Sequence, residues 1–466
     1  MKSTKINENL QKIIKKVLDA QEPAAQIVSA MVKAGGIPYL VGGAVRDALL
    51  ELPVKDLDIE VHGLSLEIAQ SILSSFGPVS LVGQAFGVLR LHGLAIDWSL
   101  PRLDSAGRHP TVTIDPHMSF ENAARRRDCT INAMGINLAN FELADPFNGM
   151  DDLKNKILRA PDISLFIEDP LRLFRIMQFI GRFEMEPDEK LNAVCAQMDI
   201  SSVSKERIEA EFDKLLLRSK RPSLGIRWLQ KIGRLITVLP ELYHTIGIPQ
   251  NPAWHPEGDV FEHSMQAIDA AALLNYNDDH EKLIILYGTL CHDLGKTTTT
   301  KLINGVLRSI GHDTAGVPMA KQLLSRITHR VELIKAVAKL VRHHMAPGLF
   351  IKSNAKLPAY KRLALKLAPE VNLYILAKVS LADKRGRNGA SSYPLTTQVA
   401  EIDLFLEKAQ NAKVLHMPEE PIVQGRDLLG IMEPGPRMGQ LIKKAYQIQI
   451  EQSIHDKQEL LKRILS

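Results

Sequence analysis

The chain has 466 residues, of which 45% are hydrophobic and 24% charged, and its formal net charge is +5. A chain of this length can hold two to four domains with cores of their own, and its composition is that of an ordinary globular protein. The small positive charge allows a polyanionic partner without requiring one, so the placement of the charges must decide.

The cysteines and the hydropathy of the chain indicate the cellular compartment in which it works. The three cysteines, Cys129, Cys195 and Cys291, are scattered and odd in number, which argues against a disulfide framework and for a reducing compartment. No stretch is long and apolar enough to span a membrane or to serve as a signal peptide. We therefore expect a cytoplasmic protein without a membrane partner, whereas the sequence does not indicate an oligomeric state.

After two helical segments broken at Glu22-Pro23, the first unit with chemical meaning runs from Ile37 to Val61. Its pattern predicts a buried strand, a turn at Gly42 and Gly43, a short helix, and a second strand. Glycine allows a tight turn or the close approach of a phosphate. A solvated strand preceded by a turn is the alternative interpretation of this stretch.

Acidic residues alternate with apolar ones on the second strand. Asp56, Asp58 and Glu60 share one face, because side chains alternate across a strand. Carboxylates so close together repel one another unless a cation lies between them, and Mg²⁺ prefers carboxylate oxygens. Asp97 lies in the apolar run Leu94–Leu100, so it is either a strand-edge residue or a third metal carboxylate.

Arginines and prolines characterise the next segments. The prolines and the lack of apolar periodicity predict a loop over residues 103–119. The segment that follows contains Arg125, Arg126, Arg127 and Asp128. The arginines could form a basic surface patch or bind triphosphate oxygens, for which guanidinium is suited.

Further on, the pattern predicts a helix on which Asp169, Arg172 and Arg175 share one face, with Asp169 and Pro170 as N-cap and first residue. For Asp169 taken alone, a capped helix with a salt bridge is the preferred interpretation. Another helix start is predicted at Ser204, with a capping-box acid nearby.

These segments resemble, in order, the motifs of class II nucleotidyltransferases, the group that contains tRNA CCA-adding enzymes and bacterial poly(A) polymerases. The matching stretches are LVGGAVRD…DLDIE, RRRDCTINAM, DPFNGMDDL, EDPLRLFR and the helix after Ser204. The resemblance implies that Asp56 and Asp58, with Asp97, hold two Mg²⁺ ions for catalysis. It implies nucleotide contacts by Gly42, Gly43, Arg46, Arg126, Arg127, Asp128, Asp169, Arg172 and Arg175.

Base selection follows from the same resemblance. Asp169 and Arg172 would hydrogen-bond the Watson–Crick edge of cytosine or adenine, each of which presents an amino group beside an acceptor nitrogen. In the family a third arginine often follows; here that position is Gln178. The RNA substrate would be recognised by shape and by its phosphates, as suits an enzyme that serves every tRNA.

Histidines mark the second half of the chain. An ordered series of histidines and aspartates on predicted helices supplies the ligands that a divalent metal requires. The series resembles the HD phosphohydrolases, which implies His263, His292, Asp293 and Asp383 as ligands. His312 and either His343 or His344, with His343 preferred, would be further ligands or phosphate contacts. The site would hold Mg²⁺ or a divalent transition metal and direct a bound water at a phosphoester.

The resemblance implies an α+β protein: a nucleotidyltransferase head with a mixed β-sheet, then an all-α neck and an all-α HD domain. We expect a helical extension over residues 1–36, the head over 37–160, the neck over 161–225, the HD domain over 226–400 and a helical segment over 401–466. The expected activity is the addition of CCA to the 3′ end of tRNA from CTP and ATP. A poly(A) polymerase, an enzyme adding only CC or only A, and an HD phosphohydrolase with an RNA-binding head are the alternatives.

Overall fold

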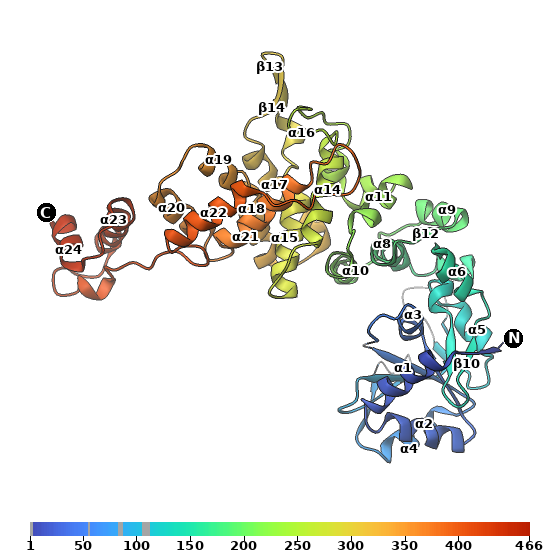
Figure 1. Ribbon diagram of the computed structural model, residues 1–466. Helices are drawn as coiled ribbons and strands as arrows, with labels where there is room; N and C mark the ends of the chain where they lie inside the picture. The colour runs from blue at the N-terminus through green and yellow to red at the C-terminus, as the bar shows by residue number, and fades with distance from the viewer. Residues whose placement is uncertain (1–2, 55, 83–86, 105–111) are drawn as a thin grey trace. The chain divides into compact units, whose positions relative to one another are not determined.

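A computed structural model describes residues 3–54, 56–82, 87–104 and 112–466 (Figure 1). By its internal contacts the chain divides into two compact units, residues 1–203 and 204–466. The division falls inside the range predicted for the neck, and each unit is described by itself. In the described ranges, none of the helices is long and apolar enough to cross a membrane.

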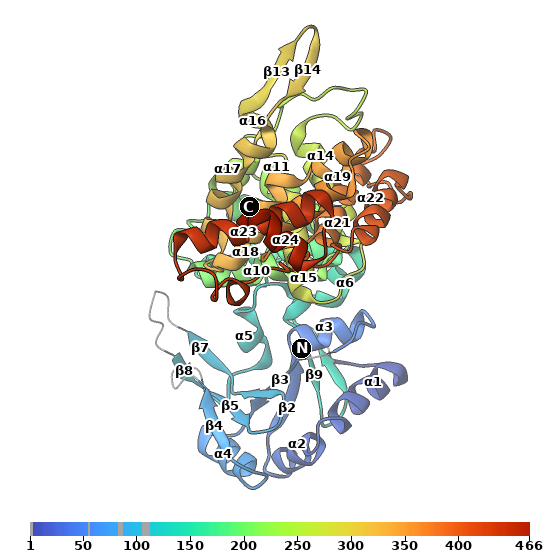
Figure 2. The same ribbon diagram turned by 90° about the vertical axis from the view of Figure 1, so that its left-hand side faces the viewer.

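The first unit is built on a mixed β-sheet (Figure 2). Among the described residues the sheet has eight strands, in the order β1-β10-β9-β2-β3-β6-β5-β4. β3 and β6 run parallel, and the other neighbours are antiparallel. The strands are β1 (Ser3–Lys5), β2 (Ile37–Val41), β3 (Leu57–His62), β4 (Val79–Val82), β5 (Val88–Leu91), β6 (Ile96–Ser99), β9 (Gly135–Asn137) and β10 (Glu142–Ala144).

The described residues of the first unit also form helices around and after this sheet (Figure 2). They are α1 (Glu8–Asp19), α2 (Ala24–Lys33), α3 (Gly43–Leu49), α4 (Leu66–Ser74), α5 (Phe120–Arg125), η1 (Thr130–Asn132), α6 (Gly149–Asn155), α7 (Ile163–Phe166), α8 (Leu171–Phe183) and α9 (Glu189–Gln197). One buried apolar cluster joins β2, α5, β10 and the residue after η1; its members are Val41, Phe120, Ala124, Ala144 and Ala133. Between α6 and α9, the short strands β11 (Ile157–Leu158) and β12 (Glu186–Pro187) pair in parallel.

Two local expectations need correction. The segment expected to be a loop, residues 103–119, contains an antiparallel strand pair, β7 (Arg102–Asp104) with β8 (Val112–Ile114), whose strands are too short to show a period; residues 105–111 lie outside the described residues. At the start of α8, Pro170 occupies the N-cap position and Leu171 begins the helix, so the predicted capping is shifted by one residue.

The second unit is mainly helical. Its helices are α10 (Lys205–Arg218), α11 (Ser223–Lys231), α12 (Leu235–Val238), α13 (Pro240–Tyr243), α14 (Val260–Ala272), α15 (Asp279–Cys291), α16 (Lys296–Thr299), α17 (His312–Ile327), α18 (Val331–His343), α19 (Ala346–Lys352), α20 (Leu357–Leu367), α21 (Leu373–Arg385) and α22 (Ala400–Asn411). Helices α14, α15, α18 and α21 pack against one another around a buried apolar core. The predicted helix start at Ser204 is confirmed, but its side chain makes no capping hydrogen bond.

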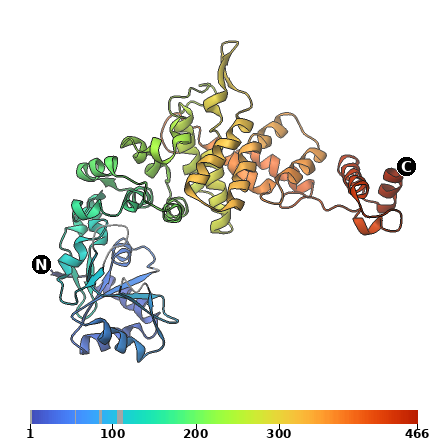
Figure 3. The same cartoon turned by 180° about the vertical axis from the view of Figure 1, so that it is seen from behind.

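A β-hairpin interrupts these helices and stands out from them in the view of Figure 3. Its strands are β13 (Thr300–Ile303) and β14 (Val306–Ser309), with Lys301 directly opposite Arg308. The expectation from the resemblance was an all-α domain, so this hairpin is a correction. The hairpin turns at Asn304 and Gly305, both with positive φ, which is the conformation that a tight two-residue turn requires.

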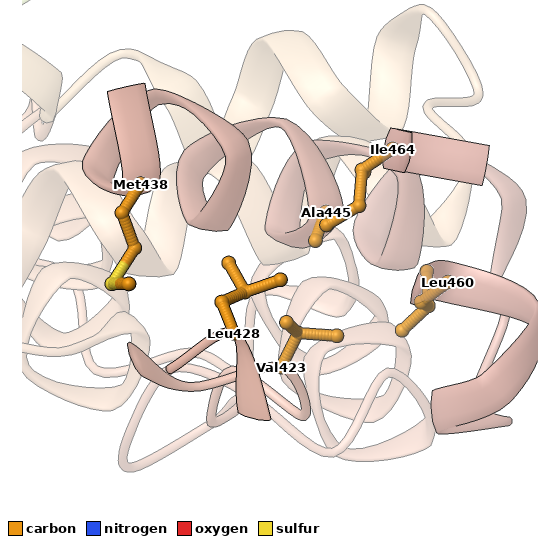
Figure 4. Packing of buried hydrophobic residues seen from close by; sticks show 6 residues of the cluster. All are labelled: Val423, Leu428, Met438, Ala445, Leu460 and Ile464. Carbon is orange, nitrogen blue, oxygen red and sulfur yellow. The ribbon is translucent and has the colours of Figure 1, made fainter. Parts of the chain in front are cut away.

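The C-terminal segment has a small core of its own (Figure 4). It contains η2 (Gly425–Asp427), α23 (Pro436–Gln452) and α24 (Lys457–Leu465). Their buried side chains are Val423, Leu428, Met438, Ala445, Leu460 and Ile464. Helix α23 packs on α20, and Arg362 of α20 donates to Glu451 of α23 at 2.8 Å. The helical periodicity predicted for this segment is therefore confirmed.

Candidate functional sites

The first candidate site is the acidic edge of the head sheet. Because β3 and β6 are parallel and in register, Asp58 lies directly opposite Asp97. Partial desolvation raises the pKa of Asp58, and the carboxylates of Asp97 and Asp56 raise it further, against the attraction of Arg127. A cation placed among these carboxylates would relieve their repulsion, so this set of oxygens suits a divalent metal ion. Asp97 also accepts a hydrogen bond from Arg90 Nε at 2.7 Å.

Gly42 lies between this acidic edge and Arg127, in a backbone conformation that favours glycine. Its φ is +71°, and a Cβ at this position would lie 3.2 Å from Arg127 Nη1 and 3.7 Å from Asp58 Oδ2. Gly43 opens α3, and a Cβ there would lie 3.2 Å from Arg46 Nη2. The glycine pair therefore brings the backbone close to the carboxylates and to the guanidinium groups.

Glu60 follows Asp58 on the same face of β3, and its charge helps to raise the pKa of Asp58. Its side chain is buried and lies 3.1 Å from His62 Nε2. Arg127 Nη2 lies 3.3 Å and Arg126 Nη2 3.6 Å from Glu60 Oε2. The hydrogen bond from His62 and the charges of both arginines lower its pKa to about 2, despite burial. Glu60 is thus the anion that pairs with both arginines, of which Arg127 also acts on Asp58.

The buried side chains of Arg46 and Asp128 form hydrogen bonds with other side chains of the first unit. Arg46 is 4% exposed; its Nη1 donates to Asn132 Oδ1 at 2.6 Å and its Nε to Asp47 Oδ1 at 2.8 Å. Asp128 accepts hydrogen bonds from Asn132 Nδ2 at 2.8 Å and from Arg175 Nε at 2.6 Å. The Arg175 charge and these hydrogen bonds outweigh burial and lower the pKa of Asp128 to about 2. These residues position the motifs relative to one another.

Asp169 and Arg172 lie together at the start of α8. Arg172 donates through Nη1 to the Leu165 carbonyl at 2.8 Å and through Nη2 to the Arg126 carbonyl. Asp169 Oδ1 accepts from the Leu171 amide at 3.2 Å. Because the Arg126 carbonyl joins the arginine segment to α8, the predicted base-reading pair is linked to the segment that approaches the acidic edge.

The second candidate site lies in the helical unit, where four histidines and two aspartates converge from five helices. His263 lies on α14, His292 and Asp293 at the end of α15, His312 at the start of α17, His344 just after α18 and Asp383 on α21. All six are at most 8% exposed. Burying so many ionisable groups is unfavourable unless they bind one another or a metal. The sequence prediction that these distant positions meet is supported by their placement.

Asp293 lies between two groups of imidazoles. Its Oδ2 is 3.2 Å from His292 Nε2 and 3.5 Å from His263 Nε2. Its Oδ1 is 3.4 Å from His312 Nε2 and 3.9 Å from His344 Nε2. Each group could hold a metal ion, with Asp293 common to both. Asp383 Oδ1 completes the first group, 3.2 Å from His263 Nε2.

The other nitrogen of each imidazole is fixed by an acceptor. The Nδ1 atoms contact Glu257 Oε1 (His263, 2.7 Å), the Thr289 carbonyl (His292, 2.6 Å), the Ser309 carbonyl (His312, 2.7 Å) and the Val341 carbonyl (His344, 2.8 Å). An acceptor at Nδ1 places the proton there and leaves the Nε2 lone pair for a metal. Burial and the neighbouring imidazoles lower the pKa of His344 to about 3, which keeps it neutral. The donor set therefore fits a divalent metal.

Two cations accompany the carboxylates of this cluster. Lys296 Nζ lies 2.7 Å from Asp293 Oδ2, and Arg387 Nη2 donates to Asp383 Oδ1 at 2.6 Å. Despite burial, the pKa values of both carboxyl groups lie well below the usual range, because these cations and the imidazoles favour the charged form. Both carboxylates are thus kept in the state that binds metals.

Of the two histidine candidates after α18, His344 joins the cluster. His343, which the sequence analysis preferred, is absent from the metal-ligating groups of the described residues. The backbone conformation at the end of α18 decides which of the two adjacent histidines points into the cluster. The apolar periodicity of the helix does not predict that conformation. Sequence reasoning also missed Glu257, Lys296 and Arg387. Lys296 could have been found, since it lies one helical turn from Asp293.

The fold and the two sites define a class of protein: a nucleotidyltransferase head joined to an HD domain. The model of the Poly A polymerase head domain matches residues 38–159, and that of the HD domain matches residues 260–383. These matches confirm the predicted mixed head followed by helices, apart from the short strand pairs that the prediction lacked.

Two relatives with the same name are similar to most of this chain. The chain is 33% identical over 364 residues to the multifunctional CCA protein of Pasteurella multocida, covering 75% of this chain and 84% of that protein. It is also 33% identical to the multifunctional CCA protein of Mannheimia succiniciproducens, covering 76% and 86%. The chain belongs to the family of multifunctional CCA proteins.

Solved structures share the fold. The Thermotoga maritima CCA-adding enzyme complexed with tRNA is 20% identical, with a TM-score of 0.62 over 100% of this chain and 99% of that one. The Bacillus stearothermophilus CCA-adding enzyme in complex with CTP is 18% identical, with a TM-score of 0.65 over 98% of each chain.

Proposed function

We propose that the protein adds CCA to the 3′ end of tRNA, without a template, from CTP and ATP. The observation that carries this proposal is the register of β3 and β6, which sets Asp58 opposite Asp97 beside Gly42. Relatives named for CCA addition support the same substrate. Within this proposal the protein acts in the cytoplasm, where tRNA matures.

Asp56, Asp58 and Asp97 would hold the Mg²⁺ ions. When bound, these ions lower the pKa of the attacking hydroxyl and neutralise triphosphate charge. Gly42 lets the backbone approach the triphosphate, and Arg126 and Arg127, oriented by Glu60, bind its oxygens. The tRNA 3′-hydroxyl attacks the α-phosphate, a new phosphodiester forms, and pyrophosphate leaves.

Asp169 and Arg172 would select the incoming base. The carboxylate accepts from the exocyclic amine of cytosine or adenine, and the guanidinium donates to the adjacent ring nitrogen. Uracil and guanine present the reverse pattern there, so they would leave buried polar groups unpaired. The anchoring of Arg172 by two backbone carbonyls supports a fixed reading geometry.

An extension assay tests this function. Purified protein and Mg²⁺ receive tRNA that ends before CCA, with CTP alone, ATP alone or both, and products are resolved to one nucleotide. We expect two cytidines with CTP alone and one terminal A with both. Asp58→Ala should abolish extension, whereas Asp19→Ala, on the exposed side of α1, should not. A long ladder with ATP alone would instead indicate a poly(A) polymerase.

We propose a second activity, metal-dependent hydrolysis of phosphoesters, at the HD cluster. The convergence of four Nε2 atoms on Asp293 supports it. Such a site could supply a metal-bound water of lowered pKa as the nucleophile. His292→Ala should abolish metal-dependent phosphatase activity while CTP incorporation persists, and His280→Ala, an exposed histidine of α15, should change neither. Full hydrolysis by His292→Ala would refute the assignment.

A further inference from the structure

A pocket of about 410 Å³ opens beside the HD cluster. Segment 249–255 forms one part of its lining, and the β14 strand with Ile310 forms another. Three of its lining residues connect it to the metal-ligating groups. His312 is itself a member, Lys296 pairs with Asp293, and His255 Nδ1 lies 2.9 Å from Glu257 Oε1, the atom that also holds His263. A molecule in this pocket would therefore reach the cluster.

The lining combines the chemistry that a nucleoside phosphoester requires. Trp254 is 64% exposed, whereas the other two tryptophans, Trp98 and Trp228, are buried. An exposed indole at a pocket offers a face on which a base can stack. Asn251 adds an amide group and Arg308 adds positive charge. By contrast, Lys296 is paired with Asp293 and donates to Gln250 Oε1 at 2.7 Å. The described lining contains no carboxylate, so an anion is not repelled by it.

The hairpin explains why Arg308 is available. Lys301 and Arg308 are exposed and directly opposite each other on the two strands. Like charges in that position repel and destabilise a hairpin, unless an anion lies near them. Arg308 lines the pocket, whereas Lys301 is not part of the lining. Both residues are positively charged, exposed and part of the same hairpin, but only Arg308 lines the pocket. Lys301 is therefore a matched control for Arg308.

We propose that this pocket binds the nucleoside part of the phosphoester that the HD cluster hydrolyses, with Trp254 stacking on the base and Arg308 binding the anion. The proposal rests on the hydrolase function proposed above. It makes Trp254 and Arg308 specificity-determining residues that select a phosphoester carrying a base over a small aliphatic one. The metal-ligating residues act on both kinds of substrate alike.

Hydrolysis of two probes tests this selection. With adenosine 3′-monophosphate, Trp254→Ala should lower kcat/KM by roughly 5- to 150-fold, the range that the loss of one base–aromatic stack of ~1–3 kcal/mol gives. With glycerol 2-phosphate, the same variant should keep its rate. Trp254→Phe should restore most of the selectivity, because a phenyl ring still stacks. Equal losses on both probes in Trp254→Ala would overturn the proposal.

Arg308→Ala and Lys301→Ala form a matched pair for the charge. We expect a raised KM for adenosine 3′-monophosphate in Arg308→Ala and an unchanged KM in Lys301→Ala. Equal effects of the two substitutions would show a general charge effect of the hairpin and would count against the pocket.

Binding can be measured apart from hydrolysis. Adenosine 3′-monophosphate should quench tryptophan fluorescence in the full-length protein, and Trp254→Phe should lose that quenching. If quenching occurs without any hydrolysis, the pocket stands and the hydrolase function fails. If hydrolysis occurs with quenching that Trp254→Phe does not change, the hydrolase function stands and the pocket proposal fails.

Discussion

At the scale of single residues, buried contacts between motifs decide what each charged side chain does. Glu60 was expected on the same face as Asp56 and Asp58, yet it holds Arg126 and Arg127. Strand periodicity predicts a face, whereas the two arginine partners of Glu60 come from a segment more than 60 residues away. That information is absent from local patterns, which is why the acid pair could be predicted and the role of Glu60 could not.

Replacing Glu60 by Gln should destabilise the head and change its acid sensitivity. The folded pKa of about 2 lies below the ordinary value of 4.5, so the charged form stabilises the fold above about pH 4.5. This stabilisation is lost as the pH falls toward 2. Two and a half pKa units correspond to about 3 kcal/mol. Urea unfolding between pH 3 and 7 should show a smaller free energy of unfolding for Glu60→Gln at neutral pH and a weaker decrease below pH 4.5.

The exposed Glu186 on β12 supplies the control for this measurement, since Glu186→Gln removes a carboxylate from the surface. Its free energy of unfolding should match the wild type. An equal loss in both variants would show that carboxylate number, and not the arginine contacts, governs the acid response.

Gly42→Ala should lower nucleotide incorporation at least tenfold. The new methyl group would crowd Arg127 Nη1, and positive φ disfavours alanine by about 1–2 kcal/mol. Gly93→Ala shares the positive φ but meets nothing within 4 Å, so it should lose similar stability and keep its activity. The extension assay and thermal unfolding, done on both variants, separate crowding from backbone strain. Equal activities would exclude close approach as the role of Gly42.

At the scale of elements, the HD cluster depends on how closely α17 approaches the end of α15. A Cβ on Gly295 would lie 2.1 Å from the His312 carbonyl and 2.5 Å from the Gly316 amide. The sequence predicted the helices that bear the ligands, because their apolar periodicity is strong. It could not predict the hairpin or the choice of His344, because a short strand and a residue beyond a helix end carry little periodic signal.

Gly295→Ala should therefore push α17 away and reduce metal binding. Overpacking of this kind is worth about 1–3 kcal/mol, and displaced ligands would lower metal affinity further. We expect a lower metal content after dialysis, measured by elemental analysis. Gly439→Ala, on α23 with open space around its Cβ, should retain the metal. Full metal content in Gly295→Ala would contradict this account of the packing.

At the scale of the whole molecule, the two candidate sites belong to different compact units. A ligand that binds only the folded state stabilises the unit that contains its site, by about 2.7 kcal/mol at 100 times Kd. Trp98 lies in the first unit, and Trp228 and Trp254 lie in the second. Their fluorescence therefore allows the stability of each unit to be followed separately.

A divalent metal should raise the unfolding midpoint reported by Trp228, and His292→Ala should abolish that shift. The Trp98 signal should respond to the same metal equally in His292→Ala and in the wild type, because the acidic edge is intact in both. Single-tryptophan variants with phenylalanine at the other two positions make this measurement possible. Loss of the Trp98 response in His292→Ala would show that the two units bind metal as one.

The separation of the sites has a consequence for how such a chain changes over generations. Each metal-ligating set lies within one unit, so a substitution that abolishes one chemistry need not remove the packing that supports the other. Selection can then act on nucleotide addition and on the proposed phosphoester cleavage as separate traits of one gene product. Descendants could lose the histidines of the second unit one by one and still retain a complete polymerising head.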